Sequence, residues 1–287
     1  MKIYPVNTGH FKLDGGAMYG VVPQSLWKRL NPPDENNMCS WALRSMLIED
    51  GDKLILVDTG LGNKQSDKFF GFYYLHGNDS LDGNLKKLGF SRDDITDVFL
   101  THLHFDHCGG AIQHNKDRTG YEPAFANAHF WSNREHWKWA TDPNPREKAS
   151  FLKENINPIE ESGQLKLLTK GVDGRTGAPE LGFDVIIVDG HTEAQMLPVI
   201  KYQGKTIVFM ADLLPSAGHI PLPYVMAYDI RPLITMKEKS AFLQEAADNN
   251  YYLFFEHDPI SELGTVTHTE KGVRLDQTFR FSEVFGQ

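Results

Sequence analysis

The stretch FLTHLHFDHCGG, residues 99–110, places four side chains of the metal-binding type within six positions, directly after an apolar run. They are His102, His104, Asp106 and His107. In an extended segment, residues two apart project to the same side, so His102 and His104 can hold one ion as a pair. A turn after this pair would bring Asp106 and His107 to a second position nearby. Imidazole and carboxylate donors without thiolate suit zinc, manganese, iron or cobalt, and zinc is the usual occupant.

Three further candidate donors follow later apolar runs, where a side chain would emerge at a sheet edge. They are His191 in VIIVDGHTEAQ, Asp212 in TIVFMADLLP and His257 in YLFFEHDP. Taken singly, each could be an ordinary loop residue. Their shared placement favours a common site, and a site for two metal ions needs more donors than the first motif alone supplies.

Composition narrows the class of partner. The chain has 287 residues, enough for one large domain or two small ones. It carries 29 Lys and Arg against 38 Asp and Glu, a formal net charge of −9. An acidic surface argues against nucleic acid or an anionic membrane as the main partner. We therefore expect a small-molecule substrate, and a homodimer remains open.

The compartment expected from the sequence is the cytoplasm. The N-terminal segment MKIYPVNTGHFKLDGG lacks the apolar core of a secretory signal, and no apolar run is long enough for a bilayer. Cys39 and Cys108 are too few for a disulfide framework or a thiolate metal cage. We expect both thiols to be reduced, and Cys108, although it adjoins a candidate donor, to be a small buried side chain.

Strand and helix patterns alternate over most of the chain, which predicts a layered α/β fold. Five short apolar runs predict buried strands: residues 54–57, 98–101, 185–188, 207–210 and 252–255. The clearest helical pattern covers residues 233–250, with capping-box spacing between Thr235 and Glu238 and with Phe242 and Ala246 one turn apart. Ser91 with Asp94 predicts a short capped turn. Residues 142–180 predict an inserted helix pair and a loop.

A faint internal repeat is visible. GDKLILVDTGL (51–61) and GKTIVFMADLL (204–214) both run from a glycine turn through an apolar strand to an aspartate. Each is later followed by a strand that ends in histidine, DVFLTHLH and YYLFFEH. Two related half-units and chance similarity between buried strands both remain open.

The pattern HxHxDH, followed by His, Asp and His, resembles the metallo-β-lactamase-fold hydrolases over roughly residues 40–260, including the VDTG turn that contains Asp58. The resemblance implies a four-layer αββα sandwich formed by residues 1–287 as a single domain, with two zinc ions. By position, it implies His102, His104 and His191 on one ion, Asp106, His107 and His257 on the other, and Asp212 bridging both. Asp58 would either orient the histidine loop or be a simple turn residue.

Two segments, residues 15–27 (GGAMYGVVPQSLW) and 212–229, are similar to a narrower group. It includes the N-acyl homoserine lactonases of the quorum-quenching type and the organophosphate-cleaving methyl parathion hydrolase. The resemblance implies opening of a lactone ring by attack of a metal-bound hydroxide. Side chains that could line the substrate pocket are Met18, Val21, Val22, Leu26, Trp27, Leu222, Tyr224 and Met226; the apolar ones could equally be core residues.

Two positions depart from this group. The lactonases carry a tyrosine three residues after the bridging aspartate, where this chain has Pro215, and the frequent GHTPGH segment reads GHTEAQ, with Glu193 and Gln195. We predict that His219 donates the catalytic proton instead, with Tyr224 and Tyr228 as alternatives.

Two other functions remain open. One is a promiscuous arylesterase or phosphotriesterase with the same metals. The other is a non-catalytic metal-binding protein that keeps the ligands only for folding.

Overall fold

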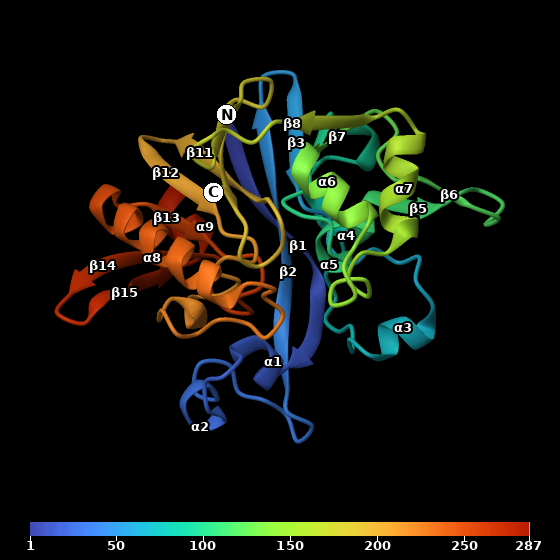
Figure 1. Ribbon diagram of the computed structural model, residues 1–287. Coiled ribbons are helices and arrows are strands. Elements are labelled where there is room, and N and C mark those ends of the chain that lie inside the picture. The colour runs from blue at the N-terminus through green and yellow to red at the C-terminus, as the bar shows by residue number, and fades with distance from the viewer. Residues whose placement is uncertain (287) are drawn as a thin grey trace. The chain divides into compact units, whose positions relative to one another are not determined.

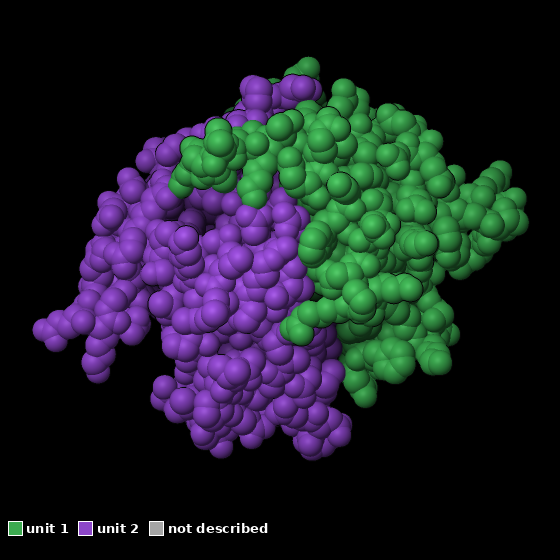
Figure 2. Space-filling view, viewed as in Figure 1, with its two compact units in different colours: residues 1–9, 43–176 green, residues 10–42, 177–287 purple. Residues whose placement is uncertain are grey.

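The computed structural model describes residues 1–286 and divides into two compact units, which Figure 2 shows in green and purple. Unit 1 comprises residues 1–9 and 43–176, and unit 2 comprises residues 10–42 and 177–287. The single domain expected over residues 1–287 stays a prediction.

Unit 1 is built on a six-stranded sheet (Figure 1). Its order is β1 (Lys2–Asp14), β2 (Met38–Asp50), β3 (Lys53–Val57), β4 (Asp97–Phe99), β7 (His129–Asn133) and β8 (Leu165–Leu168). The unit boundaries fall inside β1 and β2. From β3 onward all neighbours are parallel, so the carboxyl ends of β3, β4 and β7 lie at one edge. A separate hairpin joins β5 (Ile112–His114) to β6 (Tyr121–Pro123).

Five short helices complete unit 1: α3 (Asp67–Gly71), α4 (Leu81–Leu88), α5 (Phe105–Cys108), α6 (Arg134–Thr141) and α7 (Lys153–Glu161). Helix α4 shows why the sequence folds this way locally. The Ser80 hydroxyl accepts a hydrogen bond from Gly83 N at its start, and Gly89 ends it in the left-handed region with φ 88°. Its apolar side buries Leu81 and Leu85 in a core shared with Val98 and Phe130.

Unit 2 is built on a seven-stranded sheet (Figure 1). Its order is β15 (Gly272–Phe279), β14 (Leu263–Thr269), β13 (Tyr252–Phe254), β12 (Lys205–Phe209), β11 (Gln195–Tyr202), β10 (Phe183–Val188) and β9 (Arg175–Ala178). Its helices are α1 (Gly15–Tyr19), α2 (Gln24–Trp27), α8 (Pro232–Asn249) and α9 (Phe281–Phe285). Helix α8 buries Phe242 and Ala246, as its pattern predicts.

The internal repeat is present as a repeated topology. In unit 1, β2 and β3 form an antiparallel hairpin that turns at Gly51, and β3 then pairs in parallel with β4. In unit 2, β11 and β12 form the corresponding hairpin at Gly204, and β12 pairs in parallel with β13. Because both crossovers end in a strand that leads into histidine, each unit presents polar groups after equivalent strands.

All five predicted strands are present within two residues of their expected ends, and the α/β class is confirmed. The capped turn at Ser91 is also confirmed, since Ser91 N donates to the Asp94 carboxylate at 2.7 Å.

Two local predictions are wrong. Helix α8 begins at Pro232, ahead of Thr235, because proline is favoured in the first turn. Thr235 is therefore inside the helix and forms no capping box with Glu238. Residues 142–180 hold one helix and two short strands where a helix pair is expected; α6 ends at Thr141.

Among residues 1–286, none of the helices combines the length and the apolar character that a membrane crossing requires.

Candidate metal centre

The histidine loop, residues 100–108, starts at the carboxyl end of β4, which is buried between β3 and β7. His102 Nε2 and His104 Nδ1 lie 3.1 Å apart, and both side chains are buried. The chain then turns into α5, which begins at Phe105 and carries Asp106 and His107. His107 Nε2 lies 3.7 Å from an Asp106 carboxylate oxygen. Unit 1 thus presents two pairs of donors from one loop.

Asp58 holds this loop from the end of the neighbouring strand. It is fully buried and has a left-handed backbone with φ 56°. Its carboxylate accepts hydrogen bonds from Thr101 N at 2.8 Å and from the Thr101 hydroxyl at 2.6 Å, and it lies 3.0 Å from His107 Nδ1. These contacts favour the interpretation of Asp58 as a residue that orients the histidine loop.

The paired glycines of the quoted motif let the loop pack directly on the turn after β3. A Cβ at Gly109 would collide with the backbone of Leu61, and a Cβ at Gly110 would collide with the backbone of Thr59. Close backbone approach of this kind is a common reason for glycine.

Two buried residues of unit 1 contact the histidine loop without having been predicted. His136, on α6, accepts a hydrogen bond from Leu103 N at 2.8 Å through Nε2. Glu147 lies with Oε1 3.4 Å from His104 Nε2. No local motif marks either residue, because each contact joins the loop to a distant part of the chain.

Unit 2 supplies the other three donors. His191 follows β10, Asp212 follows β12 and His257 follows β13. One carboxylate oxygen of Asp212 lies 3.1 Å from His191 Nε2, and the other lies 3.2 Å from His257 Nε2. Asp212 therefore sits between the two histidines with one oxygen toward each.

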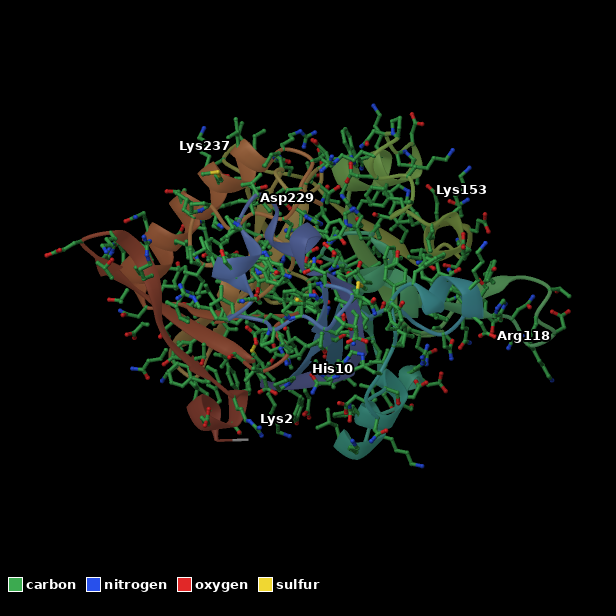
Figure 3. All side chains as sticks on the ribbon, turned by 90° about the horizontal axis from the view of Figure 1, so that it is seen from below. Lys2, His10, Arg118, Lys153, Asp229 and Lys237 are labelled. Atoms are coloured by element: carbon green, nitrogen blue, oxygen red, sulfur yellow. The ribbon has the colours of Figure 1, made fainter. Side chains whose placement is uncertain are left out.

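The two histidines of unit 2 also have fixed outer contacts. His191 Nδ1 lies 2.8 Å from Asp229, a buried residue that the sequence did not single out (Figure 3). His257 Nδ1 lies 2.8 Å from Ala42 O, which can only accept, so this nitrogen carries a proton. Burial lowers the pKa of His191, but Asp212 and Asp229 outweigh it and raise the pKa to about 10.

These donors fit a divalent metal ion. In each of the five candidate histidine ligands, one ring nitrogen lies beside another candidate metal ligand. The other ring nitrogen lies beside an oxygen atom of a residue outside the candidate ligand set, called here its outer contact. The outer contacts are His102 to the Thr101 hydroxyl, His104 to Glu147, His107 to Asp58, His191 to Asp229 and His257 to Ala42 O. Outer acceptors that fix the tautomer are typical of metal-ligating histidines. The nearby thiol, Cys108, is buried and donates to Leu103 O, as expected of a structural residue.

The segment that carries His191 is held by side chains of unit 2. The Glu238 carboxylate accepts from Asp189 N at 2.7 Å and from Gly190 N at 3.0 Å. Arg231 donates to Asp189 O and to the Glu193 carboxylate, at 2.6 and 2.7 Å. Glu193, one of the residues that depart from the lactonase pattern, therefore pairs with Arg231 and helps to hold this segment.

His219 lies in a buried 3₁₀ turn (Ala217–His219) of unit 2. Its Nε2 lies 2.9 Å from Met18 O and so carries the proton, while Nδ1 accepts from the Ser216 hydroxyl at 2.8 Å. The ring stacks on Tyr19 with centroids 4.8 Å apart. Burial lowers the pKa of His219 to about 3. Its role as proton donor stays a prediction, and these hydrogen bonds argue against it.

The predicted pocket residues differ in exposure. Met18, Val22, Trp27 and Met226 are buried, Leu222 and Tyr224 are half-buried, and Val21 and Leu26 are exposed. Val21 is 93% exposed, so its assignment to a substrate pocket rests on the sequence alone.

A family model for the metallo-beta-lactamase superfamily matches residues 44–257, a range that contains all seven candidate donors. The chain belongs to the metallo-β-lactamase superfamily. The family is one of hydrolases, and the two units contribute a sheet and helices each, the components of the expected α/β sandwich.

Curated relatives of this chain include the N-acyl homoserine lactonase of Bacillus thuringiensis, 28% identical over 119 residues. The match covers 38% of this chain and 43% of that protein. The chain therefore spans less than half the length of the curated relatives it matches.

Solved structures match over nearly the whole chain. A probable metal-dependent hydrolase from Staphylococcus aureus has a TM-score of 0.84 at 27% identity and covers 97% of this chain and 98% of its own. AidC, a dizinc quorum-quenching lactonase, has a TM-score of 0.77 at 21% identity, with 97% and 95% covered. At such identity, the likeness to AidC establishes the fold alone.

Proposed function

We propose that this chain is a dinuclear metal hydrolase that opens the lactone ring of N-acyl homoserine lactones, the reaction known as quorum quenching. The observation that carries the proposal is the set of histidine and aspartate donors in which every imidazole has an outer oxygen partner. Membership of the superfamily supports hydrolysis, and the Bacillus relatives support the substrate class.

The proposed centre uses the seven candidate donors in the arrangement that the resemblance implies. One ion would take His102, His104 and His191, the other would take Asp106, His107 and His257, and Asp212 would bind both. The two Asp212 oxygens, each turned toward a different histidine, suit a bridging carboxylate.

A bound metal pair, most simply two zinc ions, would supply a water nucleophile at neutral pH and polarise the substrate carbonyl. The protein's own contribution is orientation. Asp58 and Asp229 fix the rings of His107 and His191, and His136 fixes the backbone between His102 and His104.

An aromatic surface beside the donors in unit 1 supports an apolar substrate group. Phe105 lies between His104 and Asp106 in the sequence, and its ring contacts Phe69 and Tyr73 with centroids 5.3 and 4.8 Å apart. Phe72 and Tyr74 on the same segment are 62% and 54% exposed. Such a surface suits an acyl chain or an aryl group.

A panel of substrates tests the proposal. Protein loaded with zinc, manganese or cobalt would be assayed on N-acyl homoserine lactones, p-nitrophenyl esters and aryl phosphotriesters. We expect the highest kcat/KM on a lactone. A higher value on the aryl substrates would replace the lactonase by the arylesterase or phosphotriesterase. Bound metal without turnover of any substrate would favour the non-catalytic protein.

The small-molecule partner is part of this proposal, whereas a cytoplasmic location and a homodimer stay predictions from the sequence.

A further inference from the structure

The segment Asn144–Phe151 of unit 1, between α6 and α7, packs around one histidine of the candidate centre. The Phe151 ring lies 4.7 Å from the His104 ring, measured between centroids. Ser150 O accepts a hydrogen bond from Phe105 N at 3.0 Å, which ties the segment to the backbone next to His104. The segment therefore contacts both the ring and the main chain at this position.

The same segment carries the acidic residue Glu147, whose side chain is buried beside His104 and is 3% exposed. Its Oε2 accepts from the Trp139 indole nitrogen at 2.8 Å and from the Asn144 amide at 2.5 Å. Its Oε1 is turned toward His104 Nε2 at 3.4 Å, somewhat longer than a typical N–H···O hydrogen bond. Burial of a carboxylate costs free energy unless hydrogen-bond donors compensate it. Trp139 and Asn144 supply such donors to Oε2 and hold the Glu147 side chain with Oε1 toward His104.

His104 needs such a partner more than the other histidines do. His102, His191 and His257 turn Nε2 toward their fellow donors, and Nδ1 meets an oxygen close to it. His104 is reversed, because its Nδ1 is the nitrogen that lies 3.1 Å from His102 Nε2. The far end of its ring, Nε2, therefore points away from the loop, and a group from another segment must receive its proton.

We propose that Glu147 is a positioning residue for the metal ligand His104. Its carboxylate accepts the Nε2 proton, which leaves the Nδ1 lone pair directed at the ion and makes the imidazole a stronger donor. This inference rests on the proposed metal centre. Loss of an outer partner of this kind typically weakens metal binding about 10- to 100-fold.

Nitrogen-15 NMR of the wild-type protein tests the tautomer directly. With zinc bound, His104 should show a protonated Nε2 whose hydrogen exchanges slowly with water. A protonated Nδ1 on this ring would overturn the proposal. The measurement needs no variant, so it does not depend on how well any substituted chain folds.

Zinc affinity, measured by competition with a chelator, gives the second test. Glu147→Leu should bind one of the two ions about 10- to 100-fold more weakly, whereas Glu147→Gln, whose amide oxygen can still accept the proton but carries no negative charge, should recover only part of the loss. The matched control is Glu160→Gln on α7, where Glu160 is exposed. Unchanged zinc affinity in a folded Glu147→Leu would overturn the proposal.

The two proposals fail in distinguishable ways. A wild-type protein that binds no metal would refute the proposed function. A wild-type protein that binds two ions and hydrolyses a lactone, together with a Glu147→Leu variant of equal zinc affinity, would refute only the role of Glu147.

Discussion

Asp58 in unit 1 and Asp229 in unit 2 each place a buried carboxylate beside Nδ1 of one histidine. Each leaves Nε2 of that ring for the proposed ion. Both aspartates are therefore placed to fix the tautomer and the direction of an imidazole ring.

Asp229→Asn is expected to weaken metal binding about tenfold or more, because the amide oxygen accepts the His191 proton without the negative charge that strengthens the bond. Zinc competition with a chelator measures the effect. Asp248→Asn serves as the control, since Asp248 is exposed and contacts the exposed His268. Equal affinity in the two variants would mean that the Asp229 charge is irrelevant to the metal.

The direct donors should behave differently from one another. We expect Asp212→Ala to loosen both ions and His102→Ala to loosen one, because the two Asp212 carboxylate oxygens face different histidines. Both substitutions should lower hydrolysis by several orders of magnitude. Metal content and turnover of the same preparations are the measurements, and near-normal turnover in a verified metal-depleted variant would indicate metal-independent chemistry.

His219 tests the source of the leaving-group proton. A proton donor is needed for a lactone alkoxide but hardly for p-nitrophenolate, so its loss should affect lactones selectively, by about ten- to a thousand-fold. Since the His219 proton is engaged by Met18 O, we expect His219→Ala to lower kcat equally on both substrates and to destabilise the fold. Tyr224→Phe should then show the selective loss. Selective loss in His219→Ala would restore His219 as the donor.

At the scale of elements, helix α8 contacts residues 219–224 through one buried lysine, Lys239. Lys239 is 1% exposed, and its ammonium donates to the carbonyls of His219, Pro221 and Tyr224 at 2.9–3.1 Å. Lys237, two residues earlier on α8, is exposed (Figure 3). Burial lowers the pKa of Lys239 to about 7, although Asp229 opposes the shift.

The lowered pKa of Lys239 predicts a stability that depends on pH. Between about pH 7 and 10.5 the unfolded chain holds a proton that the folded chain has released, so folding becomes more favourable as pH rises through this window. The free energy of unfolding of the wild type should rise relative to Lys239→Met by on the order of 1 kcal/mol per pH unit. Urea unfolding from pH 7 to 9.5 measures it, with Lys237→Met as the control. A constant difference would mean that the three carbonyls keep Lys239 charged.

Elements whose signals are local could be predicted from the sequence. The HxHxDH motif predicts four donors and a turn within a few residues. In the structure the motif begins directly after β4, and the chain turns into α5 within it. The capping box at Thr235 fails because Pro232 starts α8 one turn earlier and because Glu238 is drawn to the backbone at Asp189 and Gly190. Tertiary contacts outweighed a local preference in that case.

At the scale of the molecule, local sequence signals identify the candidate metal ligands but not the residues that hold those ligands in place. The seven candidate donors follow apolar strands and so carry a sequence signal. Asp229, His136 and Glu147 carry none, because each reaches a candidate donor or the histidine loop through a buried contact with a residue 33 or more positions away. The repeated topology of the two units likewise gave only a faint signal, since buried strands resemble one another.

An anomalous diffraction map of zinc-loaded crystals, with elemental analysis of the same protein, tests the central claim most directly. The account predicts two ions per chain, about 3.5–4 Å apart, with Asp212 bound to both. One ion with the second position empty after zinc addition, or two ions that do not share Asp212, would contradict it.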